Sequence, residues 1–167
     1  MAIHTFAAIY IGTYDVSLKV FEFTNRKKFH EVDHIRSRQE LGKGTYGTGT
    51  IGYEQVEELC ETLAQFKEIM ESYKVDSYEV CAAAALRDTT NEIFVLDQIY
   101  LRTGFRVKVL SNSEHRFISY KAVAGSLVFE EMIKTSAAVV DVGGASVQIT
   151  FCLLYTSDAA DDRISVD

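Results

Sequence analysis

The 167-residue sequence contains no proline and only three cysteines. The absence of proline excludes a proline-rich linker between domains. Cys60, Cys81 and Cys152 form no CxxC pair and are odd in number, which argues against a disulfide framework and favours a reducing cytoplasm. No apolar run approaches the roughly 18 residues that span a bilayer, and the N-terminus lacks the basic region of a signal peptide. We therefore expect a cytoplasmic protein with no membrane partner.

Basic residues are also scarce. The chain has 17 Lys and Arg against 24 Asp and Glu, a formal net charge of −7, which disfavours a nucleic-acid partner. A local cluster of arginine and backbone N–H groups can still hold an anionic ligand. Hydrophobic residues make up 47% of the chain and aromatic residues 11%, enough for a packed core.

The hydrophobic pattern predicts an α/β fold. Strands are expected at residues 5–11, 18–23, 29–36, 75–84, 105–110 and 137–142, the last of them buried, with a further strand from residue 147. Helices are expected at residues 56–73, 89–102 and 113–123, with Thr90 or Asn91 capping the second and Gly104 ending it. Residues 42–52 are expected to form a flexible loop. The order βββαβαβα, followed by two more strands, predicts a mixed sheet covered by helices.

Two metal- or nucleotide-binding motifs occur, and we interpret neither as functional. His30 to His34 spells HExxH, but that zinc motif requires a helix, and the flanking residues alternate like a solvated strand. Gly42, Gly44 and Gly47 match GxGxxG, but the expected helix starts several residues too late for a dinucleotide site. The four histidines are scattered, and no serine or cysteine has the context of a catalytic nucleophile.

Two turns in which a strand runs into glycine are better candidates. They read IYIGT at residues 9–13 and VDVGGAS at residues 140–146. Glycine lets backbone N–H groups approach a phosphate closely, and a Ser or Thr hydroxyl adds a donor. Asp141, at the end of a strand, can hold Mg²⁺ or its water. One such turn alone is more simply an ordinary hairpin, but two in one chain favour phosphate binding.

These paired turns resemble those of the actin-like phosphotransferases, which have the ribonuclease-H fold. Four stretches, AAIYIGTYDVSLKVFE, CAAAALRDTTNEIFVLDQI, TGFRVKVLSNSEHRFISYKAV and VVDVGGASVQI, occur in the order found in one family. By these motifs the chain is identified as a member of the exopolyphosphatase / guanosine pentaphosphate phosphatase family, over residues 6–151. The resemblance implies a first actin-like lobe at residues 1–135 and the start of a second lobe at residues 136–151.

The resemblance also implies a function. Members remove the terminal phosphate from polyphosphate or guanosine pentaphosphate by Mg²⁺-assisted attack of water, in a cleft between two lobes. The positions that match phosphate-binding residues are Gly12, Thr13, Arg87, Gly143, Gly144 and Ser146, and Asp141 matches the metal-associated aspartate. Glu114 and His115 fall in the segment that carries the catalytic glutamate. A homodimer is a further expectation for the intact protein.

The sequence departs from the family pattern where chemistry is performed. Tyr10 stands where the first turn normally has Asp, and His115 and Gln148 stand where the family has Glu. Glu114 lies one residue before the expected base, which on a helix turns it by about 100°. Thr13-Tyr14-Asp15 replaces Ser-Asn-Ser, and Ala83 replaces a hydroxyl residue before Arg87. The alternative function is therefore a catalytically degenerate protein that binds polyphosphate or a nucleotide as a sensor or partner.

Residues 152–167 resemble something unrelated to the family. The run CLLYTSDAADD matches the translation of a transposase adapter used in sequencing libraries, and the residues after it stay in frame with that adapter. We interpret this tail as non-native. On that interpretation the chain stops one or two strands into the second lobe, so we expect it to have little or no catalytic activity by itself.

Overall fold

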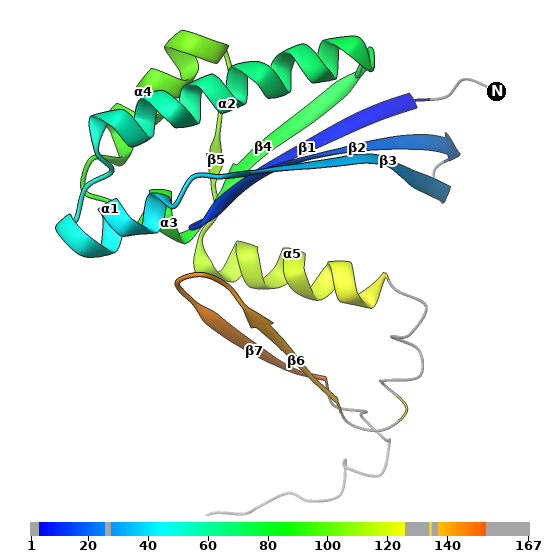
Figure 1. The fold of residues 1–167 in the computed structure, drawn as a ribbon. Coiled ribbons are helices and arrows are strands. Elements are labelled where there is room, and N and C mark those ends of the chain that lie inside the picture. The colour runs from blue at the N-terminus through cyan, green and yellow to red at the C-terminus, as the bar shows by residue number, and fades with distance from the viewer. Residues whose placement is uncertain (1–3, 26–27, 126–133, 135–136, 153–167) are drawn as a thin grey trace, which may run out of the picture. The chain divides into compact units, whose positions relative to one another are not determined.

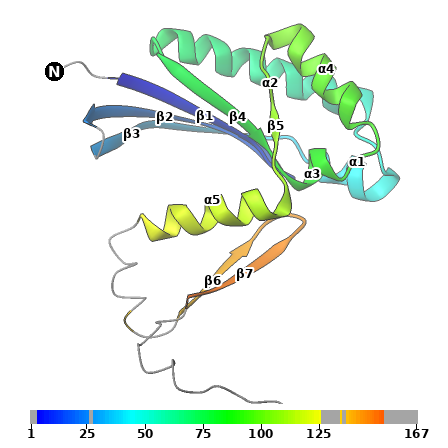
Figure 2. The ribbon, with the colours of Figure 1, turned by 180° about the vertical axis from the view of Figure 1, so that it is seen from behind.

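The computed structural model describes residues 4–25, 28–125, 134 and 137–152, and Figures 1 and 2 show the ribbon from two sides. The chain divides into two compact units, Met1–Ser113 with Gly143–Ser146, and Glu114–Val142 with Val147–Asp167. The lobe boundaries expected from the sequence stay predictions. The adapter-like tail lies outside the described residues apart from Cys152.

Five strands form one mixed sheet in the first unit, in the order β3-β2-β1-β4-β5. β1 (His4–Ile11), β2 (Asp15–Asn25) and β3 (Lys28–Arg38) make an antiparallel meander, and β4 (Ser77–Ala82) and β5 (Lys108–Val109) continue the sheet parallel to β1. The predicted mixed α/β sheet is confirmed. β5 pairs over two residues only, where the alternation at 105–110 predicted six.

Helices α2 (Tyr53–Ser72) and α4 (Glu92–Thr103) cover one face of the sheet, as both views show. Because strand side chains alternate between faces, every second residue of β1 and β2 points to these helices. The core formed there consists mainly of Ala7, Ile9, Ile11, Val16, Leu18 and Val20 from the sheet and Leu59, Leu63, Phe66, Val95 and Ile99 from the helices. The helical period predicted for residues 56–73 is confirmed.

The loop predicted at residues 42–52 is wrong over most of its length, because Leu41–Thr48 forms helix α1. Leu41 and Thr45 lie one helical turn apart and both are buried. The hydroxyl of Thr45 donates a hydrogen bond to the carbonyl of Ala85 at 2.8 Å. These tertiary contacts outweigh the helix penalty of about 1 kcal/mol for each glycine in the segment.

The segment around α4 differs from the prediction in two further ways. A short helix, α3 (Ala84–Arg87), begins where the strand was expected to continue. Asn91 precedes α4 but makes no capping bond; its amide instead accepts from the backbone N–H of Ile51 at 3.0 Å and donates to the Ile51 carbonyl at 2.9 Å. The predicted stop at Gly104 is confirmed, with a left-handed φ of 77°.

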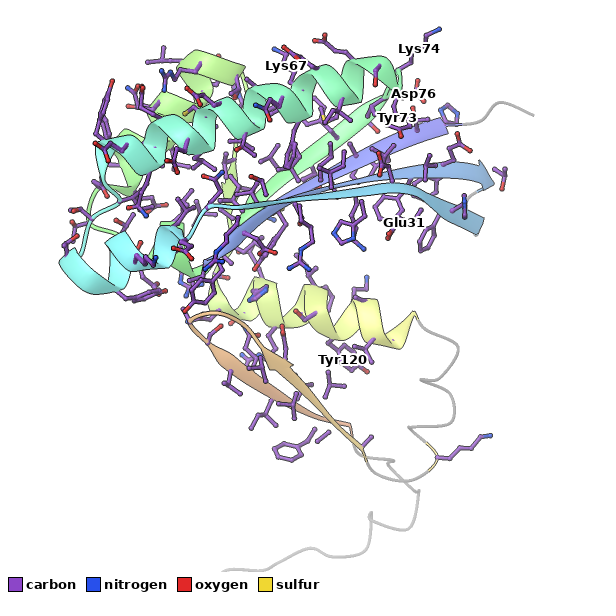
Figure 3. The ribbon with its side chains drawn as sticks, in the orientation of Figure 1. Glu31, Lys67, Tyr73, Lys74, Asp76 and Tyr120 are labelled. Atoms are coloured by element: carbon purple, nitrogen blue, oxygen red, sulfur yellow. The ribbon has the colours of Figure 1, made fainter. Side chains whose placement is uncertain are left out.

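Polar contacts close the end of the sheet where β1 begins. The hydroxyl of Tyr73, after α2, donates to Asp33 on β3 at 2.9 Å. The backbone N–H of Thr5 donates to Asp76 at 2.8 Å, and this bond lowers the pKa of the Asp76 carboxyl. Figure 3 labels Tyr73 and Asp76 at this end of α2.

The HExxH residues lie on β3, as predicted, and not on a helix. His30 and His34 are exposed there. Within the described ranges, no group of three or more His, Cys, Asp or Glu side chains is placed to hold a metal ion. The interpretation of this motif as two histidines on a solvated strand is confirmed.

The second unit contains most of helix α5 (Asn112–Ala124) and the antiparallel pair β6 (Ala137–Val142) and β7 (Val147–Cys152). The prediction that β6 is buried is wrong, since 55% of Val140 and 72% of Val142 are exposed. β6 pairs with β7 alone among the described strands, and exposed and half-covered residues alternate along it. None of the helices that the structure describes is both long enough and apolar enough to span a membrane.

Candidate phosphate-binding site

Three parallel strands end at one edge of the sheet. Ile11 of β1 pairs with Ala82 of β4, and Ala82 pairs with Val109 of β5. Two backbone hydrogen bonds continue the strand pairing at this edge. The N–H of Ala83 donates to the Ile11 carbonyl at 3.3 Å, and the N–H of Leu110 donates to the Ala82 carbonyl at 2.8 Å. Ligands of open α/β sheets commonly bind beyond the carboxyl ends of the parallel strands, and the first glycine turn lies at this edge.

The first turn joins β1 to β2. The N–H of Gly12 donates to the Asp15 carbonyl at 2.9 Å, and a Cβ at Gly12 would lie only 2.9 Å from that same oxygen. An unpaired carboxylate at Asp15 would repel phosphate. Its carboxylate instead accepts from Nε of Arg36 on β3 at 2.8 Å, so a neighbouring cation already offsets its charge.

Helix α1 is fastened to this turn. The N–H of Gly42 donates to the Thr13 carbonyl at 2.9 Å, and the N–H of Glu40 donates to the Tyr14 carbonyl at 3.0 Å. A Cβ at Gly42 would lie 2.4 Å from Cγ2 of Thr13, closer than real contacts allow. Glycine at position 42 therefore permits the close approach of α1 to the turn.

The second glycine turn, residues 143–146, belongs to the same compact unit as the sheet. A Cβ at Gly144 would lie 2.6 Å from the Tyr14 ring and 2.9 Å from Cβ of Thr13. The structure thus brings together two turns that are about 130 residues apart in the chain. They enclose with α1 a cavity of about 350 Å³, lined by Thr13, Tyr14, Gly42, Lys43, Tyr46, Gly144 and Ala145.

Arg87 is connected to this cavity through two other side chains. Its Nε donates to Asp88 at 2.9 Å and its Nη1 to the Leu110 carbonyl at 3.3 Å. The other oxygen of Asp88 accepts from the hydroxyl of Tyr46, a lining residue, at 3.0 Å. Burial, followed by the bond to Asp88, raises the pKa of Tyr46 to about 12, so the phenol stays neutral at ordinary pH.

The candidate catalytic and metal residues lie in the second unit. Nδ1 of His115 on α5 is 2.8 Å from Nε2 of Gln148 on β7. This hydrogen bond joins α5 to β7 at the two positions where the resemblance leads us to expect carboxylates. The hydroxyl of Ser119 donates to Asp141 at 2.7 Å. Glu114 immediately precedes His115 on the same helix.

The structure therefore groups the sequence candidates by role. The first unit contains all six phosphate-binding candidates, Gly12, Thr13, Arg87, Gly143, Gly144 and Ser146, and the second contains Glu114, His115 and Asp141. Sequence reasoning missed the contribution of α1, which is Gly42, Lys43 and Tyr46. The sequence signal that could have revealed this helix is the one-turn spacing of Leu41 and Thr45, at the start of the stretch interpreted as a loop.

A family model covers most of the chain, beginning after the first glycine turn. The model of the Ppx/GppA phosphatase family matches residues 20–160. The chain belongs to this family. The match extends past Phe151 into the adapter-like segment, whose interpretation stays a prediction.

Similar proteins agree with this assignment. The chain is 25% identical over 157 residues to exopolyphosphatase 2 of Mycobacterium tuberculosis, covering 89% of this chain and 48% of that protein. It is 23% identical over 154 residues to a bifunctional 3-dehydroquinate synthase/phosphatase of Fusobacterium nucleatum, covering 86% of this chain and 22% of that protein. The chain therefore spans about half or less of the length of these two relatives.

Solved structures show the same fold. A Ppx/GppA protein of Aquifex aeolicus superimposes with a TM-score of 0.78 at 27% identity, covering 93% of this chain and 49% of that one. An exopolyphosphatase of Cytophaga hutchinsonii superimposes with a TM-score of 0.82 at 22% identity, covering 90% and 47%. The predicted actin-like fold class is confirmed.

The described residues suit Mg²⁺ only in a limited way. They offer no cage of three or more metal-ligating side chains. Mg²⁺ is commonly held by one or two carboxylates together with substrate phosphates and waters, a mode that Asp141 alone can support. Asp141 would hold the ion, and the ion would offset phosphate charge.

Proposed function

We propose that this chain supplies the phosphate-binding lobe of a phosphohydrolase that removes the terminal phosphate from polyphosphate or guanosine pentaphosphate. The observation that carries the proposal is the 350 Å³ cavity lined by Thr13 from the first glycine turn and Gly144 from the second, in a member of the Ppx/GppA family. Phosphoryl transfer depends chiefly on positioning and electrostatic stabilisation, so glycine turns that bring backbone donors near a phosphate suit this role.

The proposed roles of the residues follow their places in the fold. Gly12, Thr13, Gly143, Gly144 and Ser146 belong to the two turns and would contact phosphate oxygens. Arg87 would add positive charge beside them. Glu114, or His115 through a ring nitrogen, would take the proton of the attacking water. Asp141 would hold Mg²⁺.

One observation favours the alternative, a protein that binds phosphate polymers or nucleotides without hydrolysing them. The resemblance leads us to expect carboxylates at positions 115 and 148. His115 and Gln148 are instead joined to each other by a hydrogen bond of 2.8 Å. Removal of a general base typically slows a reaction by about 10²- to 10⁴-fold, whereas phosphate binding by the turns would persist.

The two functions are separated by measuring binding and turnover side by side. Calorimetric binding of polyphosphate and release of inorganic phosphate with Mg²⁺ are measured on this chain and on any longer gene product that contains it. The phosphohydrolase proposal expects binding by both and release by the longer protein. Tight binding without release by the longer protein would establish the binding-only alternative. If Glu114→Gln leaves a measured release rate unchanged, Glu114 is not the base.

A further inference from the structure

The residue before α1 has an unusual backbone. Glu40 has φ 50° and ψ 36°, the left-handed region that non-glycine residues seldom adopt. Its N–H is bound to the Tyr14 carbonyl, and its own carbonyl accepts from Nε2 of Gln55 at 3.1 Å. The conformation of Glu40 is therefore set by the turn that lines the cavity and by α2. Unusual backbone held in this way is often associated with functional sites.

The Glu40 side chain is held between two cations. Its carboxylate pairs with Lys43 through one oxygen and with Arg38 through the other, and only 20% of the Glu40 side chain is exposed. These partners, Lys43 first, lower the pKa of the Glu40 carboxyl. One negative charge thus faces two positive charges at the rim of the cavity, and Lys43 is itself a lining residue.

This arrangement leaves Lys43 able to change partners. Its side chain is 71% exposed and has a flexible four-carbon stem, so its ammonium can turn away from Glu40 by rotamer changes alone. Arg38 remains paired with Glu40 when Lys43 leaves, so the carboxylate does not lose its only counter-charge. A condensed phosphate presents several anionic oxygens and competes well with a single carboxylate.

We propose that Lys43 is a phosphate-contacting residue of the cavity, and that Glu40 holds its ammonium in reserve until an anionic ligand displaces the carboxylate. This inference rests on the proposed function, because it presumes that the cavity receives phosphate. It assigns to α1 the one lysine among the lining residues of the cavity. It also predicts that the two partners of a single ion pair affect ligand affinity in opposite directions.

The test is calorimetric binding of inorganic tripolyphosphate to the whole 167-residue chain and its variants. Lys43→Met is expected to weaken binding by about tenfold, because it removes a charged donor. Glu40→Gln is expected to tighten binding about threefold or more, because it removes the competing carboxylate. A matched control uses the exposed pair of Lys19 and Glu31, whose ion pair of 2.7 Å lies outside the cavity lining. Lys19→Met and Glu31→Gln should each change the affinity for tripolyphosphate less than twofold.

The outcomes separate the two proposals. A purely structural role for the pair would give Lys43→Met and Glu40→Gln effects of the same sign, and that result overturns the inference. Binding by the wild-type chain that Lys43→Met weakens no more than Lys19→Met also overturns it, while leaving the phosphate site in place. No tripolyphosphate binding by the wild-type chain refutes the proposed phosphate site and, with it, the role of Lys43.

Discussion

An alanine has no room at position 144, although it fits at position 143 of the same turn. A Cβ at Gly144 would meet the Tyr14 ring at 2.6 Å, about 1 Å inside the usual separation of non-bonded carbons. At Gly143 the nearest atoms, in Ser146, lie 3.5 and 3.6 Å away, which is ordinary contact. Gly144→Ala and Gly143→Ala therefore make a matched pair that differs in steric overlap.

The size of the effect follows from what can move. The Tyr14 ring is 54% exposed and can rotate, but Cβ of Thr13, 2.9 Å from the added carbon, belongs to a backbone fixed by its bond to Gly42. Overpacking of this kind costs about 1–3 kcal/mol. Since about 1.4 kcal/mol is tenfold in an equilibrium constant, contact between the turns should weaken by about 5- to 140-fold.

Amide NMR of the labelled chain reports this contact without any ligand. Gly144→Ala should move the resonances of Thr13 and Tyr14, whereas Gly143→Ala should leave them near their wild-type positions. Calorimetry should show tripolyphosphate binding weakened at least fivefold by Gly144→Ala alone, within the range expected from the clash. Identical spectra and affinities for the two variants would refute the conclusion that the glycine turns meet.

Three further predictions test the surrounding structure. Asn91→Ala should lower the free energy of unfolding in urea by about 2–3 kcal/mol, because it removes both hydrogen bonds between the Asn91 amide and the backbone of Ile51. A loss below about 0.5 kcal/mol, less than one such bond contributes, would contradict this prediction. Gly104→Ala should destabilise the fold by about 1–2 kcal/mol, because the φ of 77° at position 104 is unfavourable for alanine. Gly47→Ala lies within α1, where an added Cβ would have no atom within 4 Å, so it should stabilise the fold by up to about 1 kcal/mol. If the melting temperatures of Gly104→Ala and Gly47→Ala shift in the same direction, these two predictions are wrong. The raised pKa of Tyr46, about 12, implies a stabilising contribution that is full below pH 10 and is lost as pH rises towards 12. Tyrosinate absorbance at high pH should lose its latest component in Tyr46→Phe, and loss of an earlier component instead would show that the pKa of Tyr46 is not raised.

The sequence by itself determined the parts of the fold that depend on local pattern. The apolar run of residues 5–11, the alternation of residues 18–23 and the helical period of residues 56–73 identified the sheet and its main helix. Burial leaves such runs and periods in the local sequence. The glycine turns at residues 12 and 143–144 were recognisable for the same reason. A glycine that directly follows a strand pattern indicates a turn without reference to distant residues.

Only the tertiary structure decided how these parts meet. The local composition of residues 41–48 favours a loop, and they become a helix because Leu41 is buried in the hydrophobic core and Thr45 donates a hydrogen bond to Ala85 on α3. Asn91 looked like a helix cap and instead binds a loop forty residues earlier. The contact of Gly144 with Tyr14, and the place of Lys43 beside them, depend on segments far apart in the chain. Local sequence patterns do not predict such contacts, because these contacts form only when distant segments pack together and their free energy depends on both partners.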